Sequence, residues 1–233
     1  MAACKLIVAL DEPDLAAARR IALAVHPHFD MRKIALERFV EAGLASIGLA
    51  RDLDLPVFLD LKLHDIPETV ERAVARASAL GATLLTVHAQ GGTTMVKRAV
   101  ERAAKEGGTL KIAAVTVLTS LDDTDVLSIG GARSARDHAL ALARLAFDAG
   151  ARAFICAPTE AASLRADLGP EAMLITPGVR PAGSAPGDQK RVATPREAVR
   201  AGANAIVVGR AIRDAADPAA AAAAIRIELE SVS

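Results

Sequence analysis

The stretch "PVFLDLKLHDIPETVERAVARASALGATLLTVHA", residues 56–89, contains one complete strand–helix–strand unit. An apolar run predicts a strand over 56–62, helical periodicity predicts a helix over 67–80, and a second apolar run predicts a strand over 84–89. Gly81 follows the helix, where a helix C-terminus often needs a residue with positive φ. Because neither apolar run alternates cleanly with polar residues, both indicate parallel strands that are covered on their two faces.

The same unit recurs along the whole chain of 233 residues. The predicted strands and the helices that follow them are 4–10 and 13–25, 29–35 and 37–52, 56–62 and 67–80, 84–89 and 93–106, 111–118 and 134–149, 153–157 and 160–167, 173–178 and 195–201, and 205–209 and 217–231. This pattern predicts an α/β fold, a (β/α)8 TIM barrel in a single catalytic domain over residues 1–233. A doubly wound open sheet is the alternative, but it more often has a glycine-rich turn after its first strand, where this chain reads "LDEPD".

The composition indicates a globular protein with an aliphatic core, since apolar residues make up 52% of the chain and aromatic residues only 2%. The formal net charge is zero, and no basic stripe or aromatic platform indicates nucleic-acid binding. The N-terminal apolar run is too short for a signal peptide or a membrane span, so we expect no membrane association and a cytoplasmic location. In that compartment Cys4 and Cys156 are expected to be buried free thiols.

One long segment without predicted regular structure, "TPGVRPAGSAPGDQKRVATP" (176–195), follows the seventh predicted strand and holds several polar side chains. Loops of this length in compact domains are usually lids or binding loops. The eighth strand ends in "VVGRAI", which contains Gly209 and Arg210. Phosphate sites in TIM barrels are often built from the loops after strands seven and eight, with glycine amides and arginine side chains as donors. The sequence therefore predicts a site for a phosphorylated small molecule.

Charged residues gather at the predicted carboxyl ends of the first three strands. Because side chains alternate along a strand, Asp60 and Lys62 are expected to point into the barrel, near the end where barrel active sites lie. Asp65 follows in the next loop, while Asp11 ends the first strand and Lys33 lies in the second. An alternating Lys–Asp–Lys–Asp array would keep every group ionised, because each charge has an opposite neighbour.

This array is compatible with several chemistries. A neutral Lys62 would form a Schiff base, but flanking aspartates favour its protonated form, which would act as a proton donor. Asp60 and Asp65 could instead bind a divalent metal together with His64 or His88, although lysines between the carboxylates disfavour a cation. A buried salt-bridge network with a purely structural role is a further alternative.

The stretch "FLDLKLHDIPETV" (58–70) resembles the signature of the orotidine 5'-phosphate decarboxylase family, Asp-x-Lys-x-x-Asp at the end of strand three. The resemblance extends along nearly the whole chain. It includes "IVALD" (7–11), "VHAQGG" (87–92), "AVTVLTS" (114–120), "TPGVRPAGSAPGDQKR" (176–191) and "VVGRAI" (207–212). The chain departs from the family's second strand at Ala35, where the family has glycine.

The resemblance implies decarboxylation of orotidine 5'-phosphate to uridine 5'-phosphate and CO2, the last step of UMP synthesis, without a metal or an organic cofactor. It implies a catalytic tetrad of Lys33, Asp60, Lys62 and Asp65, in which Lys62 is the proton donor to C6. In this family the last aspartate comes from the partner subunit, so the resemblance also implies a homodimer in which Asp65 completes the neighbouring site.

The resemblance further implies the substrate-binding residues. Asp11 and Lys33 would contact the ribose, and Thr119 or Ser120 would hold the pyrimidine edge. Ile66 and Thr69 would cross the dimer interface together with Asp65. The remaining implied contacts, mainly to the phosphate, are Pro177, Arg180, Gln189, Gly209 and Arg210, and Gln189 would also link the loop to the pyrimidine side.

Overall fold

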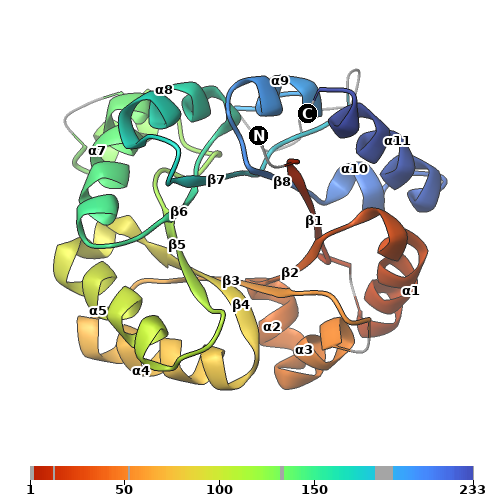
Figure 1. Ribbon diagram of the computed structural model, residues 1–233, viewed down its shortest axis with the longest axis horizontal. Helices are drawn as coiled ribbons and strands as arrows, with labels where there is room; N and C mark the ends of the chain where they lie inside the picture. Colours follow the sequence, from red (N-terminus) through yellow and green to blue (C-terminus); the bar gives the residue numbers. More distant parts are fainter. Residues whose placement is uncertain (1–2, 13, 52, 132–133, 182–190, 233) are drawn as a thin grey trace.

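The computed structural model describes residues 3–12, 14–51, 53–131, 134–181 and 191–232. In this part of the chain, eight parallel strands form a closed barrel in which spatial order follows sequence order. The helices form an outer ring around the strands (Figure 1). The predicted TIM barrel is therefore confirmed.

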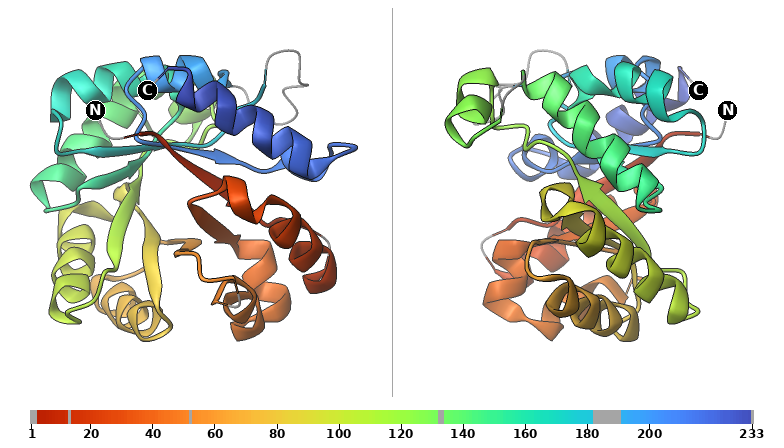
Figure 2. Two further views of the ribbon diagram at one scale, coloured as in Figure 1. Left: turned by 45° about the vertical axis from the view of Figure 1, so that its right-hand side comes forward. Right: turned by 90° about the vertical axis from the view of Figure 1, so that its left-hand side faces the viewer.

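Each strand pairs in parallel with the strands that precede and follow it in the sequence. The strands are β1 (Lys5–Ala9), β2 (Met31–Ala35), β3 (Val57–Leu63), β4 (Ala82–His88), β5 (Lys111–Val115), β6 (Ala153–Ile155), β7 (Met173–Thr176) and β8 (Ala205–Val208). β8 returns to pair with β1, with Val8 opposite Val208, and this pairing closes the barrel. In Figure 2 the red β1 and the blue β8 lie side by side.

The helices connect successive strands on the outside of the barrel. They are α1 (Leu15–Val25), α2 (Leu36–Ala42), α3 (Leu44–Arg51), α4 (Pro67–Ala79), α5 (Gly92–Lys105), α6 (Asp123–Ser128), α7 (Ala135–Asp148), α8 (Pro158–Leu168), α9 (Pro195–Arg200), α10 (Arg210–Arg213) and α11 (Pro218–Glu230), with short 3-10 helices η1 (His26–His28) and η2 (Ala89–Gly91). In α4 the buried residues Val70, Val74 and Ala77 recur at the helical period and face the sheet. Gly81 follows α4 with φ of 78°, as predicted.

The core consists of two apolar layers separated by the barrel wall. Neighbouring strand residues alternate between them, so that Phe58 and Leu84 lie inside the barrel while Leu59 and Leu85 pack under the helices. All four side chains are at most 2% exposed. Burying a side chain of this kind stabilises the fold by roughly 1.5–3 kcal/mol. Because both faces of each strand are covered, the strand sequences show little alternation.

The predicted helix 37–52 is wrong in one respect, because the segment forms two helices, α2 and α3. Gly43 separates them with φ of 52°, in the left-handed region that favours glycine. Its N–H donates to the carbonyl oxygen of Phe39 at 2.8 Å and ends α2. Two further helices, α6 and α10, are absent from the sequence prediction, since each is too short to show a helical period.

Strands β5 and β7 end earlier than predicted, at Val115 and Thr176 instead of 118 and 178. The residues that follow, 116–120 and 177–181, leave the sheet at the carboxyl end of the barrel. Their side chains and main chain are thereby available to line a cavity at this end.

The two cysteines are buried free thiols, as predicted. Burial raises the pKa of Cys4 and of Cys156 to about 12, so neither is a reactive thiolate at neutral pH. Within the described residues, none of the helices combines the length and the apolar character that a membrane span requires.

Candidate active site

A cavity of about 310 Å³ opens at the carboxyl ends of the barrel strands. It brings together most of the site residues predicted from the sequence. The predicted residues that line it are Asp11, Lys33, Asp60, Lys62, Thr119, Ser120, Pro177, Arg180, Gly209 and Arg210. The cavity therefore joins the charged cluster of the first three strands to the predicted phosphate residues of strands seven and eight.

Asp60 is the centre of the charged cluster. Lys62 Nζ lies 2.8 Å from Asp60 Oδ1, and Lys33 Nζ lies 3.3 Å from Asp60 Oδ2. Lys33 Nζ also lies 3.6 Å from Asp11 Oδ1. Asp60 is 8% exposed and Lys33 7% exposed, so this part of the cluster is held in a nearly water-free environment.

The surroundings of Asp60 keep its carboxylate ionised. Burial alone would raise the pKa of Asp60, but the ammonium groups of Lys33 and Lys62 and hydrogen bonds from Lys62 and Thr86 outweigh it and hold the pKa below its usual value. A fixed negative charge thus lies between two cations at the floor of the cavity.

Thr86 in β4 is a site residue that the sequence analysis missed. Its side chain is fully buried; its hydroxyl donates to Asp60 Oδ1 at 3.1 Å and accepts the backbone N–H of Lys62 at 2.8 Å. Lys62 has φ of 50°, a left-handed conformation that a residue with a Cβ rarely adopts. The sequence feature that could have identified Thr86 is its position inside the apolar run of β4, because a buried hydroxyl needs a hydrogen-bond partner.

Ala35 fits the backbone at the end of β2 without strain. It has φ of −86° and ψ of 172°, an extended conformation open to any residue, and it lies opposite Asp60 in the β2–β3 register. Lys33, two residues earlier, keeps both of its ion pairs.

Asp65, Ile66 and Thr69 lie outside the cavity of their own chain. Asp65 is exposed, and its Oδ1 accepts the N–H of Ile66 at 2.6 Å. Within the described residues, Asp65 does not reach Lys62, so one chain supplies only the Lys33–Asp60–Lys62 part of the predicted array. Ile66 is 65% exposed, so its apolar side chain faces solvent in the single chain.

The predicted phosphate residues form one wall of the cavity. Gly209 precedes α10, and a Cβ added there would lie 3.3 Å from the Cβ of Ala9, so glycine suits this close approach. Arg180 and Arg210 line the same wall. The backbone N–H of Arg180 donates to the carbonyl oxygen of Ala193 at 2.9 Å, which fixes the two ends of the long loop against each other. Gln189 lies outside the described residues.

His64 and His88 lie next to each other near Lys62, with ring centroids 5.6 Å apart. Burial, followed by the charges of His64 and Lys62, lowers the pKa of His88. Among the residues described, no three His, Cys, Asp or Glu side chains form a cluster that could hold a metal ion. The metal alternative of Asp60 and Asp65 with a histidine is therefore not assembled in one chain.

Comparisons with known proteins show the family to which the chain belongs. Residues 4–225 match the family model described as "Orotidine 5'-phosphate decarboxylase / HUMPS family". The chain is 55% identical over 221 residues to the orotidine 5'-phosphate decarboxylase of Anaeromyxobacter sp. (strain K), covering 95% of this chain and 96% of that protein. It is 51% identical to the enzyme of the same name from Thermobifida fusca, covering 98% and 97%. The crystal structure of orotidine 5'-phosphate decarboxylase from Lactobacillus acidophilus superposes with a TM-score of 0.83 at 36% identity, covering 97% of this chain and 99% of that one.

Proposed function

The chain belongs to the orotidine 5'-phosphate decarboxylase / HUMPS family, and from this premise we propose that it decarboxylates orotidine 5'-phosphate to uridine 5'-phosphate and CO2. This is the reaction of EC 4.1.1.23, the last step of de novo UMP synthesis. One observation carries the proposal: the Lys33–Asp60–Lys62 cluster shares a cavity with Arg180 and Arg210. A carbanion-stabilising centre and an anion-binding wall thus lie within the reach of one small ligand.

The difficulty of the reaction explains why a buried charge cluster is useful. Loss of CO2 from C6 of the pyrimidine leaves a carbanion that no adjacent carbonyl can delocalise. In our proposal no metal or organic cofactor takes part, so the protein itself stabilises the developing charge by electrostatics in a dry site. Charges already fixed by the fold need no reorganisation when the carbanion forms.

We assign Lys62 as the group that stabilises the negative charge at C6 and then protonates this carbon. Asp60, beside the substrate carboxylate, disfavours that carboxylate's charge in the ground state. Lys33 holds Asp60 in place and, with Asp11, contacts the ribose hydroxyls. The short contacts around Asp60 support these roles, because they fix both ammonium groups on one carboxylate.

The walls of the cavity suggest how the substrate lies. Thr119, or Ser120 beside it, would hold the pyrimidine edge, and both residues line the cavity after β5. After β7 and β8 the phosphate contacts would be Arg180, Gly209 and Arg210, with Gln189 from the long loop, and Pro177 lines the cavity beside Arg180. Phosphate binding far from C6 would be used to order the reacting groups.

We propose that the active protein is a homodimer in which Asp65 completes the charged array of the neighbouring subunit. Ile66 and Thr69 would enter the interface with it. The exposure of Asp65 and Ile66 supports this arrangement, because it leaves both side chains accessible to a second subunit. We also propose a cytoplasmic location and one catalytic domain over residues 1–233.

The direct test is to mix the purified protein with orotidine 5'-phosphate and excess chelator and follow the pyrimidine absorbance. We expect conversion to uridine 5'-phosphate at a rate that the chelator does not change. A well-folded protein that leaves the substrate intact would contradict the proposed activity, and activity that returns only on adding a divalent metal would contradict the cofactor-free mechanism.

The shared site has its own test. Lys62→Ala and Asp65→Ala variants are each expected to be inactive as homodimers. Mixing them after dissociation should restore part of the activity, because one site of the mixed dimer contains both native residues. Mixtures that stay inactive although mixed dimers form would show that Asp65 acts elsewhere.

A further inference from the structure

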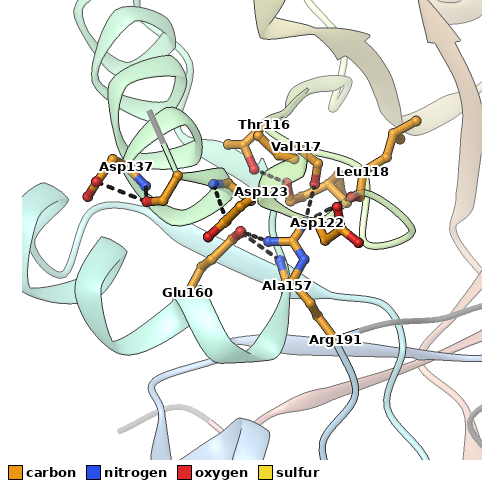
Figure 3. A network of polar contacts seen from close by, with 12 residues as sticks. Thr116, Val117, Leu118, Asp122, Asp123, Asp137, Ala157, Glu160 and Arg191 are labelled. Atoms are coloured by element: carbon orange, nitrogen blue, oxygen red, sulfur yellow. Dashed lines mark hydrogen bonds and ion pairs between the residues drawn. The ribbon is translucent and has the colours of Figure 1, made fainter. Parts of the chain in front are cut away.

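Arg191 is almost buried and binds two separate parts of the barrel, α8 and the segment after β5. Its guanidinium forms an ion pair with Glu160 of α8 and donates to the carbonyl oxygens of Val117 at 3.3 Å and Leu118 at 2.8 Å. Figure 3 shows the guanidinium lying between the Glu160 carboxylate and the main chain that follows β5. The side chains of Arg191 and Glu160 are only 15% and 2% exposed.

Glu160 is itself held firmly. Its Oε2 accepts the N–H of Ala157 at 2.9 Å, at the start of α8. A buried ion pair of this kind is weak evidence for stability, since well-packed apolar residues often serve a fold equally well. The guanidinium instead fixes the relative positions of the groups that it binds, because its planar fork can bind a carboxylate and two carbonyl groups in one arrangement.

Arg191 connects two segments that line the active-site cavity: its guanidinium binds the main chain after β5, and its own segment pairs with the residues after β7. Val117 and Leu118 line the cavity and lead directly into Thr119 and Ser120 of the pyrimidine wall. Two residues after Arg191, Ala193 accepts the backbone N–H of Arg180, which belongs to the phosphate wall. The guanidinium is thus a short physical link between the site of the base and the site of the phosphate.

We propose that Arg191 is a positioning residue that couples phosphate binding on one wall to the placement of the pyrimidine on the other. The inference rests on the proposed function, since it takes the two walls to hold the phosphate and the base of one nucleotide. A bound phosphate would restrain the segment that carries Arg180. Because Arg191 lies close to this segment and binds the carbonyl groups of Val117 and Leu118, the main chain there would be restrained as well. For a ligand without a phosphate, Arg191 would contribute little to affinity or to the placement of the pyrimidine.

The test compares substrates with and without the phosphate. Orotidine 5'-phosphate and orotidine are assayed with the native protein, with Arg191→Lys, and with the double variant Glu160→Gln, Arg191→Gln. Lysine keeps the charge but lacks the fork. The double variant removes both charges together and so leaves no lone buried carboxylate. Arg144→Lys is the matched control, because Arg144 pairs with Asp167 between α7 and α8 on the surface, away from the cavity.

We expect both Arg191 variants to lose on the order of tenfold or more in kcat/KM for orotidine 5'-phosphate, the size of a typical coupling between sites. The loss for orotidine should be several-fold smaller, and Arg144→Lys should change neither. Equal losses for the two substrates would overturn the proposal, because they would mean that Arg191 only supports the pyrimidine wall. Unchanged values for both substrates would also overturn it.

A binding measurement separates this inference from the proposed activity. The ratio of uridine 5'-phosphate to uridine affinity should fall in the Arg191 variants, even if the native protein catalyses a different reaction. A native protein that decarboxylates orotidine 5'-phosphate, with an affinity ratio that the variants leave unchanged, would refute the coupling and leave the function standing. A native protein that neither binds uridine 5'-phosphate nor decarboxylates its substrate would refute both.

Discussion

The two halves of the active-site cavity are built in different ways. On the side of β1 to β4, strand residues supply the functional groups, and side chains such as Lys33, Asp60 and Thr86 bind each other directly. On the side of β5 to β8, the lining comes mostly from the segments after the strands, and main-chain groups carry many of the contacts. In this second half Arg191 connects segments that follow different strands. In the first half the side chains of neighbouring strands bind each other without a connecting residue.

This difference corresponds to the different tasks proposed for the two halves. A group that transfers a proton needs its position fixed to a fraction of an ångström, which strands provide better than loops. A binding wall must admit and release a ligand, and loops on a rigid scaffold are suited to this. We therefore expect substitutions in the first half to lower kcat and substitutions in the second to raise KM.

The largest expected effect is that of Lys62→Ala in the first half. Removing the proposed proton donor should lower kcat by at least about 10³-fold, while affinity for uridine 5'-phosphate changes little. Single-turnover kinetics and product binding would measure the two quantities. Turnover close to that of the native protein would show that Lys62 is not the essential donor.

Arg210→Ala tests the second half. Loss of a charge-assisted contact to the phosphate should raise KM and lower kcat/KM by on the order of 10–100-fold, with a much smaller change in kcat. Orotidine, which has no phosphate, should be processed equally well by the variant and the native protein. An unchanged kcat/KM for orotidine 5'-phosphate would place the phosphate elsewhere.

Thr86→Val should give a smaller effect, on the order of tenfold in kcat, because it removes two hydrogen bonds but no charge. The valine keeps the shape of the side chain but leaves Asp60 and the Lys62 N–H without the hydroxyl. Thr86→Ser restores the hydroxyl and should recover most of the activity. If the two variants have equal activity, Thr86 has no positioning role.

The smallest expected effect on catalysis comes from Glu12, a buried carboxyl beside the first half that sharpens the contrast with Asp60. Neither of its carboxylate oxygens has a hydrogen-bond partner in another described residue. Burial raises the pKa of Glu12 to about 7 and Asp11 adds to the rise, while its own backbone N–H, Arg38 and Arg213 oppose it. We expect Glu12→Gln to leave kcat almost unchanged and to alter the pH dependence of stability.

Between about pH 4.5 and 7, folded Glu12 keeps a proton that the unfolded chain has released, so the free energy of unfolding falls as pH rises. The contribution is fully present below pH 4.5 and lost above 7. It amounts to about 3 kcal/mol at most. Denaturant unfolding at pH 5 and pH 8 should show a smaller fall for Glu12→Gln than for the native protein. Parallel pH curves would contradict this.

Much of the fold and site could be predicted because the informative residues are local in sequence. Each of these signals is contained in a short stretch of sequence: the apolar runs of the strands, Gly81 after a helix, and the spacing of Asp60 and Lys62. The break at Gly43 was missed, because apolar periodicity continues across it. Thr86 was missed because its partners lie 24 and 26 residues away on another strand. The role of Arg191 depends on contacts more than 30 residues distant, which a single sequence does not reveal.

The left-handed backbone at Lys62 has a consequence for the evolution of this barrel. A residue with a Cβ held at φ of 50° costs on the order of 1–3 kcal/mol. A glycine at position 62 would relieve that strain, so Lys62→Gly should melt at a higher temperature than Lys62→Ala although both lack the amine. Selection for thermal robustness alone would favour losing the lysine. Under the role proposed for Lys62, its strained conformation marks a position where function outweighs stability.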